Sequence, residues 1–175
     1  LLKALREQLP DQVAWCPQQP GLVPMLSTFH NIYMGALDNH SLLYNLANLI
    51  KPLPAARSAV EPIAKLLGLE QQLFSSTDKL SGGQQQRTSI GRALIQKRAI
   101  FLGDEPVANV DEYQGDALLQ LICQRHQTVV LALHDIAQAL STCTRIIGLK
   151  DRAIVLDAPS NQLQASDLAD LYGVS

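Results

Sequence analysis

The sequence is poor in cysteine and contains no long apolar run. Its three cysteines are Cys16, Cys123 and Cys143, and no pair of them has a Cys-x-x-Cys spacing. An odd number of scattered cysteines argues against a disulfide framework or a cysteine metal site, and indicates reduced, mostly buried thiols of a cytosolic protein. No apolar stretch approaches the roughly 18 residues of a membrane span, and no signal peptide is visible.

The sequence also has no strong excess of positive or of negative charge. The net charge is -2, so nothing indicates a nucleic-acid binder and we expect no nucleic-acid partner. The 175 residues, 47% of them hydrophobic, are enough for one globular domain with a real core. The chain starts with leucine, and the spacing of Leu2, Leu5 and Leu9 is that of the end of a helix. We therefore expect a chain that is cut at its N-terminus.

The most informative local pattern is Leu80-Ser81-Gly82-Gly83-Gln84. Ser81 stands three residues before Gln84, which is the spacing of a capping box and predicts the start of a helix. Gly82 and Gly83 remove side chains from its first turn, where backbone N–H groups and the positive helix end face outward. That arrangement suits a phosphate. An ordinary capped helix with a flexible glycine pair is the alternative.

Periodicity and turn residues predict the surrounding elements. Before the motif we expect a helix at Leu1–Leu9, a strand at Gln12–Cys16, and helices from Ser27, at Ser41–Lys51 and at Ala55–Leu67. After it we expect buried strands at Ala99–Gly103 and Thr128–Leu133, helices at Gly115–His126 and Ile136–Cys143, a hairpin of Arg145–Leu149 and Ala153–Asp157, and a last helix that Ser160 caps. The alternation of strands and helices predicts a doubly wound α/β sheet.

The segment from Ser27 to Lys79 shows no strand signal, so we expect an inserted helical lobe. Two apolar stripes predict its packing, namely Leu42, Leu43, Leu46, Leu49 and Ile50 on one helix, and Val60, Ile63, Ala64 and Leu67 on the next. An exposed patch for a partner is the alternative. In the helix after Ser81, Gly91 costs up to about 1 kcal/mol of helix stability unless close packing requires it.

Polar residues stand at the ends of the predicted strands. Asp104 and Glu105 follow an apolar strand; alternating side chains would send them to opposite sides, which suits Asp104 to Mg²⁺ and Glu105 to an attacking water. An acidic helix cap, or a turn closed by Pro106, is the alternative. His134 ends the next strand, where a structural role competes with contact to a phosphate. Asp111 has the default interpretation of a turn residue.

Taken in order, these motifs resemble the nucleotide-binding subunit of ATP-binding-cassette (ABC) transporters. The segment from Val13 to Gln18 resembles the Q-loop, Leu80 to Gln84 matches the signature motif, and Ile100 to Asp104 resembles the Walker B strand. Glu105 matches the catalytic glutamate, Ala108 to Asp111 resembles the D-loop, and His134 resembles the switch histidine.

The resemblance implies a P-loop NTPase-like, mostly parallel sheet flanked by helices, incomplete at its N-terminus. Residues 1–175 would form one partial ATPase domain, with 27–79 as helical subdomain and 1–26 and 80–175 as parts of the core. It implies ATP and Mg²⁺ as cofactors and three catalytic residues, Glu105, His134 and Gln18. Asp104 and Gln18 would bind the metal ion. The nucleotide would be bound by Ser81, Gly82, Gly83, Gln84 and Asp111.

The resemblance also implies partners. A second ATP-binding subunit would dimerise head to tail, each signature motif capping the ATP of the other subunit. Transmembrane permease subunits would dock on the Gln18 loop and the helical subdomain, with a periplasmic or surface solute-binding protein acting indirectly. The subunit would sit peripherally on the cytoplasmic side of the inner membrane. The segment from Gly35 to Pro52, the triple glutamine from Gln84 and the stretch from Asp104 to Ala108 look like ATPases of phosphonate-type importers.

One family motif is absent. No lysine in the sequence follows a glycine, so the Walker A motif Gly-x-x-x-x-Gly-Lys-[Ser/Thr] is missing. We expect truncation before Leu1 rather than loss, and a chain that by itself binds ATP weakly and does not hydrolyse it. Two alternatives stay open, a non-catalytic ABC-type binding or regulatory module and an ABC ATPase outside transport.

Overall fold

The computed structural model describes residues 11–172, so the helix expected at Leu1–Leu9 lies outside the described residues. The chain divides into two compact units, one up to residue 131 and one from residue 132 onward, and each is described by itself. None of the helices between residues 11 and 172 combines the length and the apolar character that crossing a bilayer requires.

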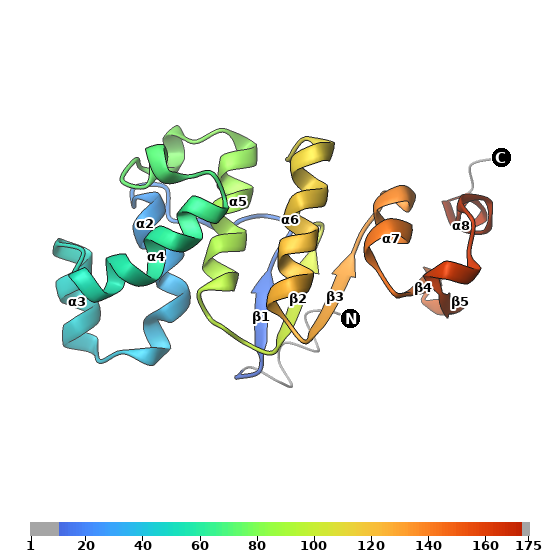
Figure 1. Ribbon diagram of the computed structural model, residues 1–175, viewed down its shortest axis with the longest axis horizontal. Coiled ribbons are helices and arrows are strands. Elements are labelled where there is room, and N and C mark those ends of the chain that lie inside the picture. Colours follow the sequence, from blue (N-terminus) through green and yellow to red (C-terminus); the bar gives the residue numbers. More distant parts are fainter. Residues whose placement is uncertain (1–10, 173–175) are drawn as a thin grey trace. The chain divides into compact units, whose positions relative to one another are not determined.

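The first unit contains a three-stranded sheet (Figure 1). Its strand order is β1 (Val13–Cys16), β2 (Ile100–Asp104) and β3 (Thr128–Ala132). β1 and β2 pair in parallel, with Val13 opposite Ile100 and Cys16 opposite Gly103. Both are largely buried, as expected for strands of a parallel sheet. β3 lies at the end of this order opposite β1 and is only partly buried, so the expectation of a buried strand was wrong for it.

Two long helices flank this sheet. They are α5 (Gly82–Leu94) and α6 (Glu112–Arg125). α6 begins three residues before the expected Gly115, because Asp111 caps it: the Asp111 carboxylate accepts a hydrogen bond from the Gln114 N–H at 3.0 Å. The predicted inward residues Leu118, Leu119 and Ile122 are buried.

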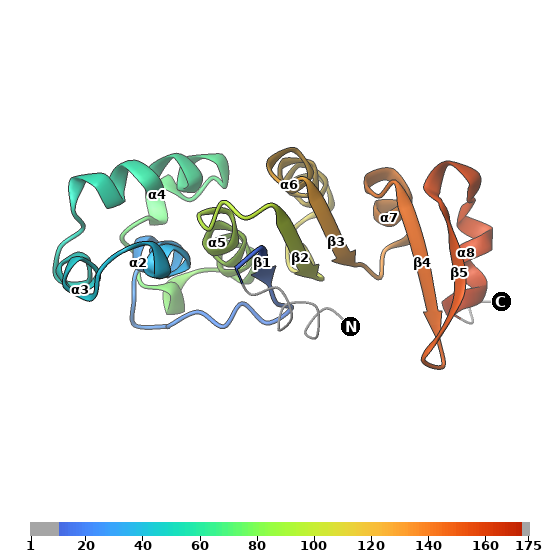
Figure 2. The same ribbon diagram turned by 90° about the horizontal axis from the view of Figure 1, so that it is seen from below.

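The segment from Ser27 to Lys79, called the lobe below, is helical as its lack of strand signal predicted. Its helices are α2 (Thr28–Tyr33), α3 (Leu42–Ile50) and α4 (Pro54–Leu66), with 3₁₀ turns at Met34–Asn39, Glu70–Gln72 and Thr77–Lys79. Figure 2 shows these helices gathered beside α5. The lobe contains no strand, only an isolated bridge between Ser27 and Ser76. Ser27 caps α2 as predicted, its hydroxyl accepting from the His30 N–H.

Close packing of the lobe explains the glycine inside α5. A Cβ atom placed on Gly91 would lie 3.0 Å from both Ile32 Cγ1 and Leu67 Cδ1, which belong to the α2 and α4 segments. Such a contact is tighter than packed side chains normally accept. The helix propensity that Gly91 forfeits is therefore offset by the close approach of three helices.

The apolar stripe of α3 was assigned to the wrong environment. The five leucine and isoleucine residues expected to pack inward are 48 to 83% exposed, namely Leu42, Leu43, Leu46, Leu49 and Ile50. Asn48 takes the inward position instead and is fully buried, where its carboxamide accepts from the Leu53 N–H at 2.9 Å and donates to Tyr44 O at 3.1 Å. On α4 the predicted stripe of Val60, Ile63, Ala64 and Leu67 is buried.

The second unit holds a hairpin between two helices. Its elements are α7 (Ile136–Thr142), β4 (Arg145–Lys150), β5 (Ala153–Pro159), a 3₁₀ turn at Ser160–Gln162 and α8 (Ala165–Tyr172). β4 and β5 pair antiparallel as predicted. The two turn residues have left-handed φ values, 51° at Asp151 and 66° at Arg152, which suit the twist of a hairpin. Ser160 does not cap the last helix. The Asp167 carboxylate accepts from the Gln164 N–H at 2.8 Å there, just before Ala165.

The cysteines are free but not all buried. Cys16 is fully buried in β1, with its Sγ 3.7 Å from Ser89 Oγ, and burial raises the pKa of its thiol to about 11. Cys143 is half-buried and Cys123 is exposed, so the expectation of mostly buried thiols holds for Cys16 alone.

This difference predicts selective alkylation. At pH 8 only about one Cys16 thiol in a thousand would be a thiolate, and it is shielded from solvent. We expect iodoacetamide to modify Cys123 on the native protein and Cys16 only after unfolding in urea, as read by peptide mass spectrometry. Equal rates at the two sites in the native state would contradict the burial of β1.

Candidate functional site

The pairing of β1 with β2 places Gln18 beside Glu105. Cys16 and Gly103 are partners at the ends of the two strands, so the next residues of both leave the sheet at the same edge. There the Gln18 carboxamide Nε2 donates a hydrogen bond to Glu105 Oε2 at 3.2 Å. Asp104 is the last residue of β2 and is half-buried. Two carboxylates and one amide, all predicted from the sequence, thus share one edge of the sheet.

Glu105 has an unusual backbone conformation. Its φ is 45°, in the left-handed region that non-glycine residues rarely adopt, and its carbonyl accepts from the Ala108 N–H at 3.2 Å. The turn at Pro106, which the sequence analysis gave as an alternative, is therefore present and runs from Glu105 to Ala108. Strand alternation ends at Asp104, so this turn, and not alternation, sets the direction of Glu105. Strained residues of this kind concentrate at functional sites.

The Ser81 motif forms the predicted helix start. Ser81 Oγ accepts from the Gln84 N–H at 3.3 Å, and Gln84 Oε1 accepts from the Ser81 N–H at 3.0 Å, which completes a capping box. The first bond of the helix ladder runs from the Gln85 N–H to Ser81 O at 2.9 Å. The amides of Gly82 and Gly83 precede that bond at the positive end of α5, an arrangement that favours an anion.

The glycine pair lies against the loop that holds Asp111. A Cβ atom placed on Gly83 would lie 2.9 Å from the backbone carbonyl oxygen of Asn109, whereas one on Gly82 would lie 3.9 Å from Asn109 Cβ. Gly83 is therefore required for the start of α5 to touch the 108–111 loop. Asp111, expected as a turn residue, caps α6.

Two side chains, those of Arg92 and Asn31, hold the loop that follows Gln18. The Arg92 guanidinium of α5 donates to the carbonyls of Pro20 and Gly21, the latter at 3.0 Å. Asn31 of α2 is fully buried and bonds both backbone groups of Val23. Its Oδ1 accepts from the Val23 N–H at 2.8 Å, and its Nδ2 donates to the Val23 carbonyl at 3.1 Å. The Gln18 loop is thereby tied to both the signature helix and the lobe.

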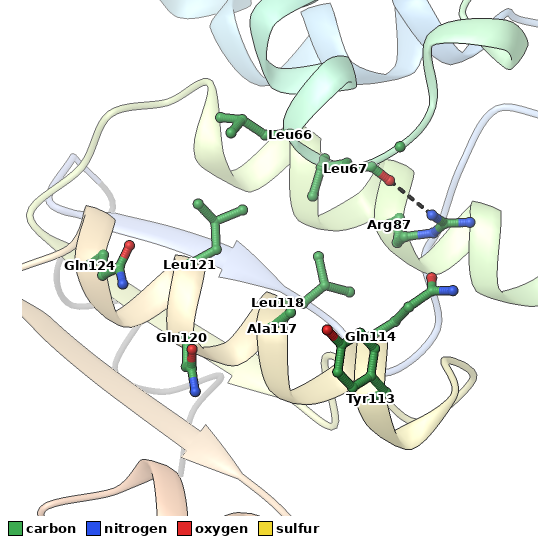
Figure 3. A pocket seen from close by; sticks show the side chains of 11 residues that line it. Leu66, Leu67, Arg87, Tyr113, Gln114, Ala117, Leu118, Gln120, Leu121 and Gln124 are labelled. Atoms are coloured by element: carbon green, nitrogen blue, oxygen red, sulfur yellow. Dashed lines mark hydrogen bonds between the residues drawn. The ribbon is translucent and has the colours of Figure 1, made fainter.

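A separate pocket lies between α4, α5 and α6. It has a volume of about 500 Å³ and is lined largely by leucine and glutamine side chains of α4 and α6 (Figure 3). Arg87 borders it and donates to Leu67 O at 2.9 Å. None of the predicted site residues lines this pocket, so its position does not identify the site.

The remaining candidate is His134, which belongs to the second unit and follows β3. Its role stays a prediction. The described residues hold no cluster of three or more His, Cys, Asp or Glu side chains of the kind that forms a complete metal cage. Mg²⁺ in nucleotide sites needs only one or two carboxylates together with phosphate oxygens, and Asp104 fits that requirement.

Comparison with known proteins supplies the family. A family model described as ABC transporter matches residues 2–108, more than half of the chain. The chain belongs to the ABC transporter family. The predicted resemblance is confirmed.

Several curated members of this ABC family are similar to the chain over almost all of its length. "Phosphonates import ATP-binding protein PhnC 2" of Roseobacter denitrificans is 34% identical over 174 residues, 97% of this chain and 64% of that protein. The corresponding PhnC of Ruegeria pomeroyi is 35% identical over 166 residues, 93% of this chain and 60% of that protein. The chain thus spans less than two thirds of the length of these relatives.

Solved ABC cassettes share the fold. A dimeric, post-hydrolysis state of an ATP-binding cassette bound to ADP and Pi has a TM-score of 0.74 and 28% identity, covering 90% of this chain and 67% of the other. An inward-facing structure of a putative metal-chelate type ABC transporter has a TM-score of 0.75 at 21% identity, covering 93% and 64%. These likenesses confirm the predicted P-loop NTPase-like fold.

Gln86 was not among the predicted site residues. Its side chain is fully buried, and its Nε2 donates to Pro106 O at 2.8 Å. A signal was present. Gln86 shares the spacing of Ile90, Ala93 and Leu94 on one face of α5, so a polar residue occupies a position of the apolar stripe. A buried amide at such a position needs a partner, which here is the turn after β2.

The glycine pair gives a direct stability test. Gly82→Ala should keep or raise the free energy of unfolding by up to about 1 kcal/mol, because alanine favours the helix and the added methyl makes ordinary contact. Gly83→Ala should lower it by about 1–3 kcal/mol, because its methyl group meets the Asn109 carbonyl. Urea unfolding curves of the two variants check this. Equal stabilities would show that the 108–111 loop does not press on α5.

Proposed function

We propose that this chain is the core of the ATP-binding subunit of an ABC importer, which couples ATP binding and hydrolysis to uptake of a small solute through membrane partners. The observation that carries the proposal is the contact of Gln18 with Glu105, next to Asp104 at the ends of paired parallel strands. In open α/β sheets, ligands bind at the carboxyl ends of the strands.

Each residue then has a chemical task. The Glu105 carboxylate takes a proton from the attacking water as general base. Asp104 would hold Mg²⁺, with Gln18 as the second predicted ligand, and that ion would neutralise charge on the phosphates. His134 would donate a hydrogen bond to the γ-phosphate. The Gln18 side chain, which holds Glu105 at 3.2 Å, orients the base before nucleotide arrives.

The signature motif would act on a second subunit. The capping box leaves the Gly82 and Gly83 amides at the positive end of α5, and their lack of side chains allows a phosphate to approach closely. Asp111, on the adjoining loop, would face the same dimer interface. Head-to-tail pairing of two cassettes would place this surface over the ATP of the partner. The dimeric structure of a similar cassette bound to ADP and Pi supports dimerisation.

The chain as printed contains no Walker A motif. That motif supplies the lysine and backbone amides that hold the β- and γ-phosphates. We therefore expect the isolated chain to bind ATP weakly and to hydrolyse none. Turnover would need the residues of this chain together with a Walker A motif, so the assembled transporter in the experiments below is one whose ATP subunit carries both. Should ATP titration of the assembled complex show no binding to this subunit, the alternative of a non-catalytic regulatory module would replace the proposal.

The names of the similar proteins suggest which solute is transported. Those named above are phosphonate import ATP-binding proteins, so we propose a phosphonate-like anion as the transported solute. No residue of the described site would contact that solute, because the ATP subunit would dock on permease subunits that form the path. A periplasmic or surface solute-binding protein would deliver it. The subunit itself would lie peripherally on the cytoplasmic side of the membrane.

A Glu105→Gln substitution tests the chemistry. Removing the general base should lower ATP turnover of the assembled transporter by at least about 100-fold while ATP binding persists, because the amide keeps the shape and loses the proton acceptor. Glu112→Gln is the control, since Glu112 is an exposed carboxylate in the first turn of α6. Turnover and nucleotide binding are measured together. Loss of ATP binding in Glu105→Gln would show that Glu105 has another role.

The exposed stripe of α3 tests the permease partner. Leu43 is 80% exposed among four other exposed apolar side chains of α3, an unusual concentration for a surface that meets only water. Leu43→Glu should weaken co-purification with the permease subunits without lowering the melting temperature of the subunit. Ile154→Glu, at an exposed apolar position of β5, is the control. Unchanged co-purification of Leu43→Glu would exclude this face as the docking site.

A further inference from the structure

One side chain joins the signature helix to the turn that carries Glu105. Gln86 lies one turn into α5 and is fully buried. Its Nε2 donates to Pro106 O at 2.8 Å and lies 3.5 Å from Glu105 O. Both neighbouring backbone groups are carbonyls, which only the NH₂ side of the amide can satisfy, so the orientation of the carboxamide is determined. Its Oε1 accepts no hydrogen bond within the described part of the chain.

This contact bears on the strained residue of the site. Glu105 stands at φ 45°, a conformation that persists only where the surroundings hold it. Its carbonyl receives the Ala108 N–H, and the next carbonyl, that of Pro106, receives Gln86. Pro106 has no N–H of its own to donate, so the turn has few internal bonds with which to hold its shape. The Gln86 side chain of α5 therefore holds the turn from outside, through its hydrogen bond to Pro106 O.

The same helix carries the signature motif. Ser81 and Gln84 close the capping box at its N-terminus, and Gly83 lies against Asn109 O on the far side of the turn. Gln86 follows Gly83 by three residues and lies on the buried side. A shift of the start of α5 would therefore move the carbonyls of Glu105 and Pro106 with it, through the 2.8 Å hydrogen bond and the contact at Asn109.

We propose that Gln86 is a positioning residue that couples the signature helix to Glu105 of the same chain. The proposal rests on the proposed function, in which the signature contacts the ATP of a partner subunit and Glu105 acts on the ATP of its own. Gln86 would then connect the two ATP sites of a head-to-tail dimer. It contacts neither nucleotide and acts by fixing the backbone turn on which the base is mounted.

A pair of matched variants tests this coupling. Gln86→Met keeps the length of the side chain and removes both polar atoms. Gln85→Met is the control, because the Gln85 Nε2 also bonds two backbone carbonyls, those of Thr77 and Leu80, but does not reach the Glu105 turn. In the assembled transporter, Gln86→Met should lower kcat for ATP by at least about ten-fold with KM within about two-fold, since a displaced base costs chemistry rather than binding. Gln85→Met should keep kcat within about two-fold.

A second measurement does not depend on ATP. Amide hydrogen exchange of Ala108, whose N–H bonds the Glu105 carbonyl, should become at least about ten-fold faster in Gln86→Met and stay unchanged in Gln85→Met. Gln86→Asn, one methylene too short to reach Pro106 O, should show the same acceleration and serves if Gln86→Met does not fold. Unchanged exchange in the Gln86 variants would overturn the proposal.

The two measurements distinguish a failure of the positioning role of Gln86 from a failure of the proposed function. If the wild-type transporter hydrolyses ATP and Gln86→Met is as active as Gln85→Met, the positioning role is wrong and the proposed function stands. If the wild-type assembled transporter hydrolyses no ATP, the proposed function fails. Amide exchange at Ala108 then still decides whether Gln86 holds the turn.

Discussion

The parallel pairing of β1 with β2 is the constraint on which the candidate site depends. Its register sets Cys16 opposite Gly103, so two chain segments that are 87 residues apart leave the sheet together and bring Gln18 to Glu105. A slip of one residue would turn the side chains of the slipped strand to the other face and separate the amide from the carboxylate. The apolar character of the strands fixes the register, and the polar residues at their ends use it.

Buried carboxamides connect the pieces that the sheet alone cannot hold. Asn31 ties the Gln18 loop to the helical lobe, Gln86 ties the signature helix to the Glu105 turn, and Asn48 ties α3 to the segment that follows it. Each of these side chains is fully buried. A buried amide without partners is costly, so each one selects a single arrangement of its neighbours. The buried amides thus fix the arrangement of the segments around the site, while the apolar core stabilises the fold.

The sequence predicted most element positions, because caps and strand ends have local signals. Ser27, Ser81 and the Asp151-Arg152 turn all stand where the pattern places them. It did not predict which face of α3 is buried, because an amphipathic pattern shows two faces without saying which one meets the core. The left-handed φ of Glu105 was likewise missed, since it arises from tertiary contacts and from no local preference of glutamate. Of the site, the sequence predicted the residues at the strand ends but not the amide that fixes their turn.

The insertion of the lobe between β1 and β2 has a kinetic consequence. The two ends of the lobe meet, since the Thr28 N–H donates to Ser75 O at 3.0 Å. The strand pairing must close the long span between Cys16 and Ile100 against chain entropy. When the lobe has folded, the span that separates the two strands is compact, and the loop to be closed is effectively much shorter. We therefore expect the helices to form before the sheet edge that carries Gln18 and Glu105. Substitutions that weaken the interior of the lobe would delay the appearance of the site even where they touch none of its residues.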